Sequence, residues 1–299
     1  MSNRNRFGIS TAILLLLAPS AAFAQDSSLV FTQAAEPAVV LGGGGGLLKN
    51  GPAPQKTFFT RHDLLATGIA AAVTGGVMVF DKKIGLWTQA PHVQGSASLH
   101  HTVSQLTRLN ETPLTIASVL TYGIGRVSNS KTTADVGLHW TEALLLTDVI
   151  CQAIRGPLGR ARPRVSQDDP FSFHFGQGFT HFEYRAFPSL HSGVGFATAA
   201  ALVGEIRERN QNASRYAAPV LYAVALIPGV TRMYLNQHWA SDVVSGAFIG
   251  QLIGSRVVHY AHTHNPTKLD RALLATSVTP DANGGIMVMM NVQSLFGGN

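Results

Sequence analysis

The stretch TRMYLNQHWASD, residues 231–242, places Arg232, His238 and Asp242 at fixed spacings. If the segment is helical, His238 and Asp242 lie four residues apart on one face. A carboxylate in that position can accept an imidazole N–H, which fixes the tautomer and makes the other ring nitrogen a better nucleophile. Such pairs are also common as structural surface pairs, so this spacing alone does not assign a function.

The segment RGPLGRARP, residues 155–163, brings two arginines to the start of a long loop. Guanidinium groups present several fixed donors and match phosphate oxygens bidentately. Arg155 and Arg162 are therefore candidates for holding a phosphate. On their own they equally suit the end of a helix, where the helix dipole favours cations.

The segment PSLH, residues 188–191, precedes an apolar stretch. Ser189 is a typical helix N-cap, and His191 then stands in the first turn. The N-terminus of a helix offers free N–H groups to an anion, so His191 would lie beside an anion bound there. The alternative is an ordinary cap followed by a surface histidine.

Together and in this order, the three segments resemble the three-part signature of the type 2 phosphatidic acid phosphatase (PAP2) superfamily. That family shares its fold with the bacterial class A acid phosphatases and the vanadium haloperoxidases. Its signature reads K-x6-R-P, P-S-G-H and S-R-x5-H-x3-D, and the spacings within all three parts match residues 155–242. The resemblance implies an all-α fold, a helical bundle of about six core helices.

The resemblance also implies a role for each residue. His238 would attack phosphorus and form a phosphohistidine, Asp242 would orient His238, and His191 would protonate the leaving oxygen and later activate water. The phosphoryl oxygens would be held by Arg155, Arg162, Arg232, Ser189 and the backbone at Leu190. Three arginines can neutralise the phosphoryl charge without a divalent metal, so we expect no metal ligands and no cofactor.

Three residues depart from the signature. Arg155 replaces a lysine and keeps the charge, although a compact ammonium becomes a planar fork. Thr231 replaces a serine and keeps the hydroxyl. Leu190 replaces a glycine whose backbone N–H approaches the phosphate closely. If Leu190 needed a positive φ, the site would be strained.

The sequence therefore predicts an exported, metal-independent phosphatase acting on a phosphate monoester or pyrophosphate of a lipid or other apolar alcohol. Phosphatidate, undecaprenyl pyrophosphate, lipid A phosphate and small soluble monoesters all remain open as substrates. One alternative is a vanadium haloperoxidase, whose cofactor vanadate would occupy the same constellation. A second is a non-catalytic phosphate-binding homologue, because of Leu190.

Apolar segments rich in small residues indicate helices over residues 64–80, 98–109, 114–127, 136–154, 192–206, 217–230 and 242–260. Residues 156–187 are loop-like, and a loop of this length inside a compact domain is usually functional. It carries many aromatic residues, which suggests an apolar leaving group or membrane contact, or else a loop folded over the bundle. Near the end of the chain, residues 273–279 and 286–292 flank PDANGG, which predicts a short C-terminal β-hairpin.

The N-terminus carries Arg4 and Arg6, an apolar run and the motif Ala22-Phe23-Ala24. This pattern predicts a secretory signal peptide over residues 1–24, with a retained membrane anchor as the alternative. The predicted organisation is then a flexible linker at 25–57, a PAP2-like helical domain at 58–265 and a tail with the hairpin at 266–299. The expected location is periplasmic or secreted.

Membrane association is left open by the sequence. The apolar runs are mostly about 14–19 residues long, at or below the length of a spanning helix. This slightly favours a soluble or peripherally attached bundle over a polytopic membrane protein. The net charge of +6 is spread without long basic runs, and no nucleic-acid module is evident. His262 and His264 have no paired cysteine or carboxylate nearby in the sequence to complete a metal site.

Overall fold

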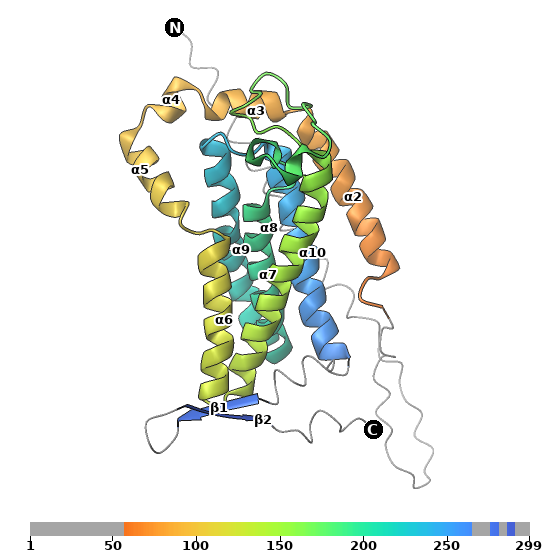
Figure 1. Cartoon of the computed structure of the whole chain (residues 1–299), viewed down its shortest axis with the longest axis vertical. Helices are drawn as coiled ribbons and strands as arrows, with labels where there is room; N and C mark the ends of the chain where they lie inside the picture. The colour runs from red at the N-terminus through yellow and green to blue at the C-terminus, as the bar shows by residue number, and fades with distance from the viewer. Residues whose placement is uncertain (1–56, 265–275, 281–285, 291–299) are drawn as a thin grey trace. The chain divides into compact units, whose positions relative to one another are not determined.

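The computed structural model describes residues 57–264, 276–280 and 286–290 (Figure 1). The predicted signal peptide and nearly all of the predicted linker lie outside these residues. The elements are α2 (Arg61–Met78), α3 (Asp81–Thr88), α4 (Pro91–Gln94), α5 (Ala97–Leu106), α6 (Glu111–Val127), α7 (Lys131–Leu158), η2 (Gln177–Phe179), η3 (Phe182–Tyr184), α8 (Leu190–Arg209), α9 (Gln211–Tyr234), α10 (Ala240–Thr263), β1 (Thr276–Pro280) and β2 (Ile286–Met290).

The predicted all-α bundle is confirmed, and its helices are longer than the apolar runs that predicted them. Polar residues outside those runs start the helices, because their side chains accept from backbone N–H groups that have no partner within the helix. Ser130 caps α7 in this way, Asn210 caps α9, and Ser189 caps α8. The expected helix over residues 64–80 is confirmed as α2, and a further helix that the sequence did not predict, α3, follows it at an angle of 58°. The predicted hairpin is confirmed by the antiparallel pairing of β1 with β2.

Helix α8 lies at the centre of the bundle and packs against α7, α9 and α10 (Figure 1). Its contact with α10 is a seam of small residues in which the two backbones touch. A Cβ added at Gly250 would lie 2.0 Å from the carbonyl oxygen of Gly193, and one at Gly246 would lie 2.2 Å from that of Ser189. The seam therefore holds the N-terminal turns of α8 and α10 close together.

The main apolar core lies between α7, α8 and α10. Its buried members include Trp140, Leu144, Leu190, Val194 and Ile253. Leu190 is therefore a core residue, although it belongs to the PSLH segment. Its side chain packs into the bundle.

Several helices also expose large apolar side chains. On α6 these are Ile116, Val119, Leu120 and Ile124, and α9 exposes Val220 and Val224. Among the described helices, α9 alone is long and apolar enough to cross a membrane, and the bent pair α2–α3 meets the same criterion if it is counted as one span. Only 22% of the apolar window of α9 is buried, so most of this apolar stretch is not covered by the other helices of the bundle.

The seam can be tested with Gly250→Ala. The added Cβ has no space against the backbone of α8, so α8 and α10 must separate. We expect the free energy of unfolding to fall by about 1–3 kcal/mol, measured by chemical denaturation. Gly123→Ala on α6 is the matched control, because nothing lies within 4 Å of its added Cβ. It should leave stability unchanged or raise it by up to about 1 kcal/mol. Equal effects of the two variants would contradict the close packing.

Candidate active site

The three sequence segments meet at one end of the bundle. Arg155 lies in the last turn of α7, and Gly159, at a φ of 60°, ends that helix. Arg162 follows in the long loop. His191 lies in the first turn of α8, and His238 lies in the short loop between α9 and α10. The structure thus brings together residues that are far apart in the sequence.

Two of the arginines are buried and keep donors unused. Arg155 donates from Nη2 to the carbonyl oxygens of Arg185 and Pro188 at 3.2 and 3.5 Å, and its buried Nε has no partner. Arg162 donates to the carbonyl oxygen of Phe182 at 3.1 Å and to Gln237 Oε1 at 2.6 Å. Its guanidinium carbon lies 3.9 Å from the centre of the Phe182 ring, which fixes its plane.

These arginines remain cations at neutral pH. Burial and, after it, the charge of Arg155 lower the pKa of Arg162 to about 10. Burial also lowers the pKa of Arg155 and of Arg232. Arg232 is half-buried in the last turn of α9, and no hydrogen bond or ion pair joins its guanidinium to another described residue. Three positive charges therefore lie at this site, and their guanidinium groups keep N–H donors that are not engaged by the protein.

His238 has its tautomer set by the backbone. Its Nδ1 lies 2.8 Å from the carbonyl oxygen of Ala186, and a carbonyl can only accept, so Nδ1 carries the proton. Nε2 then keeps its lone pair. This atom is buried and has no hydrogen-bond partner in the structure. The sequence expected Asp242 to accept from His238 on one helical face, but His238 precedes α10, and Asp242 Oδ2 is the more distant acceptor at 3.5 Å.

Asp242 instead joins a buried ionic network that the sequence did not predict. Its Oδ2 accepts from the Trp239 N–H at 2.7 Å, which caps α10, and its Oδ1 accepts from Arg160 at 2.5 Å. Arg160 also donates to Asp81 of α3 at 2.8 Å and to Ser241 Oγ at 2.7 Å. Both carboxylates and the guanidinium are completely buried. Burial raises the pKa of Asp242, and the charge of Arg160 opposes that rise.

His191 lies across from His238, with the ring centres 6.0 Å apart. Its Nε2 lies 3.3 Å from Glu111 Oε2, at the start of α6, and its buried Nδ1 has no hydrogen-bond partner in the structure. Burial, followed by the nearby charges of Arg232, Arg155 and Arg162, lowers its pKa to about 2. The same three arginines lower the pKa of His238, after burial. Both imidazoles are thus neutral at pH 7 and lie in the positive field of the arginines.

Ser189 and Leu190 have local structural roles. Ser189 Oγ accepts from the Ser192 N–H at 3.4 Å as the cap of α8, and its own N–H donates to the carbonyl oxygen of Asp242 at 2.9 Å. Leu190 is the first residue of α8, and it is not among the described non-glycine residues with positive φ. The strain that a positive φ would cause is therefore absent at this position.

Parts of the chain are similar to known proteins. Residues 137–266 match the family model of the PAP2 superfamily. A lipid A 1-phosphatase from Porphyromonas gingivalis is 27% identical over 168 residues, which cover 54% of this chain and 31% of that protein. The match therefore spans about a third of the relative's length.

A solved structure is also similar. It is the transmembrane PAP2-type phosphatidylglycerolphosphate phosphatase from Bacillus subtilis, with a TM-score of 0.48 and 19% sequence identity. The likeness covers 68% of this chain and 95% of that one.

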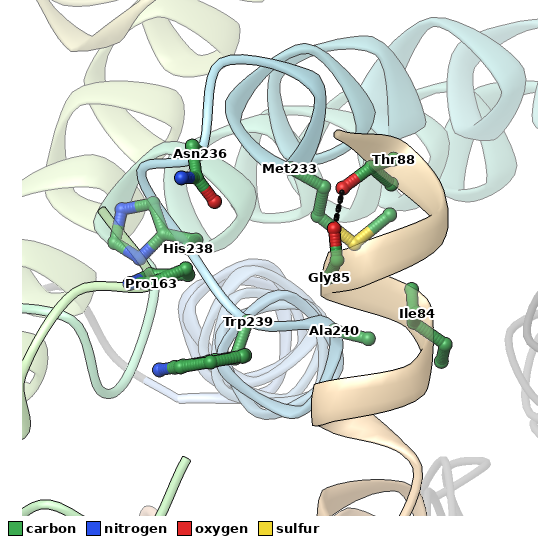
Figure 2. A pocket seen from close by; sticks show the side chains of 9 residues that line it. All are labelled: Ile84, Gly85, Thr88, Pro163, Met233, Asn236, His238, Trp239 and Ala240. Carbon is green, nitrogen blue, oxygen red and sulfur yellow. Dashed lines mark hydrogen bonds between the residues drawn. The ribbon is translucent and has the colours of Figure 1, made fainter. Parts of the chain in front are cut away.

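The candidate site is closed on the side of His238 that faces α3. Figure 2 shows the narrow crevice there, with His238, Asn236 and Pro163 on one side and Ile84 and Gly85 of α3 on the other. The crevice leaves no room for a water molecule. A Cβ on Gly85 would lie 3.1 Å from the Trp239 ring, so the helix packs directly on that ring. A phosphate must therefore reach Nε2 from the side of the arginines.

Sequence reasoning missed three residues of this region: Asp81, Glu111 and Arg160. Arg160 lies inside the RGPLGRARP segment, but nothing in its spacing separates a structural arginine from a phosphate-binding one. Asp81 and Glu111 come from α3 and α6, outside all three segments. No local pattern could have connected them to the site.

The buried network can be tested with Arg160→Met. Two buried carboxylates then lose their cation, and we expect the free energy of unfolding to fall by about 3–5 kcal/mol. Arg164→Ala is the matched control, because its ion pair with Glu183 is partly exposed. That change should cost at most about 1 kcal/mol in the same denaturation experiment. A loss below 1 kcal/mol for Arg160→Met would contradict the network's structural role.

Proposed function

We propose that this chain is a phosphatase that hydrolyses a phosphate ester or anhydride of a lipid through a phosphohistidine. The observation that supports it most is the environment of His238 Nε2, a buried lone pair without a partner that lies in the field of three arginines. An electron-rich oxygen dianion is the ligand that such a positive, donor-rich site favours. The lone pair then lies where it can attack the bound phosphorus.

In the proposed reaction, His238 Nε2 forms a bond to phosphorus while the bond from phosphorus to the leaving oxygen breaks. Arg155, Arg162 and Arg232 neutralise the charge on the equatorial oxygens. His191 gives its proton to the leaving oxygen. In the second step, His191 accepts a proton from water, whose oxygen attacks phosphorus and releases His238.

His191 must be an imidazolium at the start of this reaction. The arginines oppose that charge, but a bound phosphate dianion cancels much of their field. Glu111 Oε2, at 3.3 Å from Nε2, also favours the imidazolium. Substrate binding therefore raises the pKa of His191, which then takes up a proton from solvent, so the acid forms when there is a phosphate to cleave.

A groove beside His191 supports a lipid as the substrate. It has a volume of about 320 Å³, and four apolar side chains line it together with four polar ones: Ile116, Leu144, Leu145 and Val194, and Glu111, Thr112, Thr115 and Asp148. Glu111, which contacts His191, lies at the same groove. A leaving alcohol protonated by His191 would thus lie next to the apolar side chains of this groove. The P. gingivalis relative is named for a lipid substrate, which agrees with a lipid as the substrate of this chain.

Exposed aromatic residues support a location at a lipid surface. In the long loop, Phe175 is 77% exposed and Phe179 is 62% exposed, so the loop presents large apolar side chains to its surroundings. Together with the exposed apolar faces of α6 and α9, they favour contact with membrane lipid. We propose an exported protein in contact with a membrane, and its purification should require detergent.

The mechanism predicts that His238→Ala lowers phosphate release by at least about a thousandfold, because no other group can accept the phosphoryl. EDTA should leave the wild-type rate unchanged, since the arginines replace a metal. His181→Ala is the matched control, because His181 is an exposed histidine of the long loop. The assay is phosphate release from lipid and soluble substrates in detergent. Substantial activity in His238→Ala would contradict the nucleophile.

The same assay separates the alternatives. A non-catalytic homologue would bind phosphate or vanadate without releasing phosphate from any substrate. A haloperoxidase would oxidise halide with vanadate and peroxide. Acid-sensitive phosphorylation of the enzyme, detected by intact mass and absent in His238→Ala, would support the phosphohistidine directly.

The role of Leu190 is tested by Leu190→Gly, which restores the family glycine. Because Leu190 packs in the core, we expect a loss of about 2–5 kcal/mol in stability. Activity per folded molecule should stay within about threefold, because the backbone is already helical at this position. Leu145→Ala, at a side chain that is 56% exposed, is the control for stability. A gain of tenfold or more in Leu190→Gly would show that leucine obstructs the phosphate.

A further inference from the structure

A second cluster of titratable side chains lies on three helices of the bundle. His139 comes from α7, Glu205 from α8 and His262 from α10. His139 Nδ1 lies 2.5 Å from Glu205 Oε1, and His262 Nε2 lies 3.1 Å from the same oxygen. The side chains of His139 and Glu205 are 10% and 1% exposed. Two imidazoles and one carboxylate thus converge on one point inside the bundle.

The geometry matches a metal site of known type. The three ligand atoms all lie within 4.8 Å of one another. Zinc bound at about 2.0–2.2 Å from each ligand, in tetrahedral geometry, would place them roughly 3.3 Å apart. That spacing lies between the shortest distance in this cluster, 2.5 Å, and its upper limit of 4.8 Å. Small shifts of the side chains would therefore be enough to bind the ion. Two histidines and one glutamate leave a fourth position for water, and imidazole ligands favour zinc over magnesium or calcium.

The surroundings of Glu205 orient it toward the two histidines. Arg209 donates to the other carboxylate oxygen, Oε2, and also to the backbone carbonyl of Glu205 at 2.7 Å. This contact fixes the carboxylate plane and leaves Oε1 for the histidines, which is how outer contacts commonly orient a metal ligand. His262 is 26% exposed and gives an ion a route from solvent.

We propose that His139, Glu205 and His262 bind a zinc ion that joins α7, α8 and α10. The sequence predicted no metal ligands in this chain, because Glu205 and His139 are far from His262 in the sequence. Glu205 follows His191 by fourteen residues on α8, which places the cluster about 20 Å from the candidate active site. The ion would therefore stabilise the bundle without taking part in phosphoryl transfer.

The test is zinc titration of the full chain in detergent, after EDTA treatment and removal of the chelator, followed by calorimetry. We expect one zinc per chain in the wild type and a melting temperature that rises by several degrees with zinc. His262→Gln keeps a hydrogen-bonding side chain beside Glu205 but removes the imidazole. It should weaken zinc binding by at least tenfold and abolish the rise in melting temperature. His139→Ala should have the same effect.

His264→Ala is the matched control, since it removes a histidine two positions away whose ring stacks on Tyr260. It leaves the same number of histidines as His262→Gln and should bind zinc like the wild type. Melting of each variant without zinc shows whether it is folded. Absence of zinc binding in the folded wild type would overturn the proposal, as would equal binding by His262→Gln and wild type. Phosphate release at 25 °C should not change in His262→Gln, so this result is independent of the proposed phosphatase activity.

Discussion

The candidate site depends on the charged contact between Arg160 and two buried carboxylates. Removing three charges from water is costly, and the contact is stable only if every donor and acceptor finds a partner. Arg160 meets this condition, because its three nitrogens donate to Asp81, Asp242, Ser241 and the carbonyl oxygen of Pro170. The contact joins α3, the long loop and α10. It therefore fixes the loop that carries Arg162 relative to the turn that carries His238.

This network changes how Asp242 acts on His238. Its two oxygens are already engaged by Arg160 and by the Trp239 N–H. The nearest acceptor for His238 Nδ1 is the Ala186 carbonyl, which selects the tautomer without help from a charge. The carboxylate at 3.5 Å adds a negative charge that favours a positive imidazole ring as the bond to phosphorus forms. The Ala186 carbonyl thus sets the tautomer of His238, and the Asp242 carboxylate stabilises its positive charge. The sequence had assigned the orientation of His238 to Asp242 alone.

The sequence predicted the helical bundle and the meeting of its three segments, because those depend on apolar periodicity and on a long ordered pattern. It could not predict contacts made by residues outside the segments. Asp81, Glu111 and Glu205 come from α3, α6 and α8, and only the packing of helices places them. The sequence also could not predict the role of Leu190, since the pattern around a leucine at a helix start is the same whether its side chain faces a ligand or the core. Helix α3 was missed because it begins with Asp81, Lys82 and Lys83, just after the apolar run that predicted α2 ends.

The positive field of the site raises a problem that Glu111 helps to solve. Three arginines bind product phosphate as well as substrate, and equal binding of both does not speed turnover. A carboxylate beside His191 reduces the positive potential on the side where the alcohol leaves. It also favours the protonated form of His191, which is the form that can give a proton to the leaving oxygen and later take one back from water. We infer that Glu111 balances retention of the phosphoryl group against release of the product.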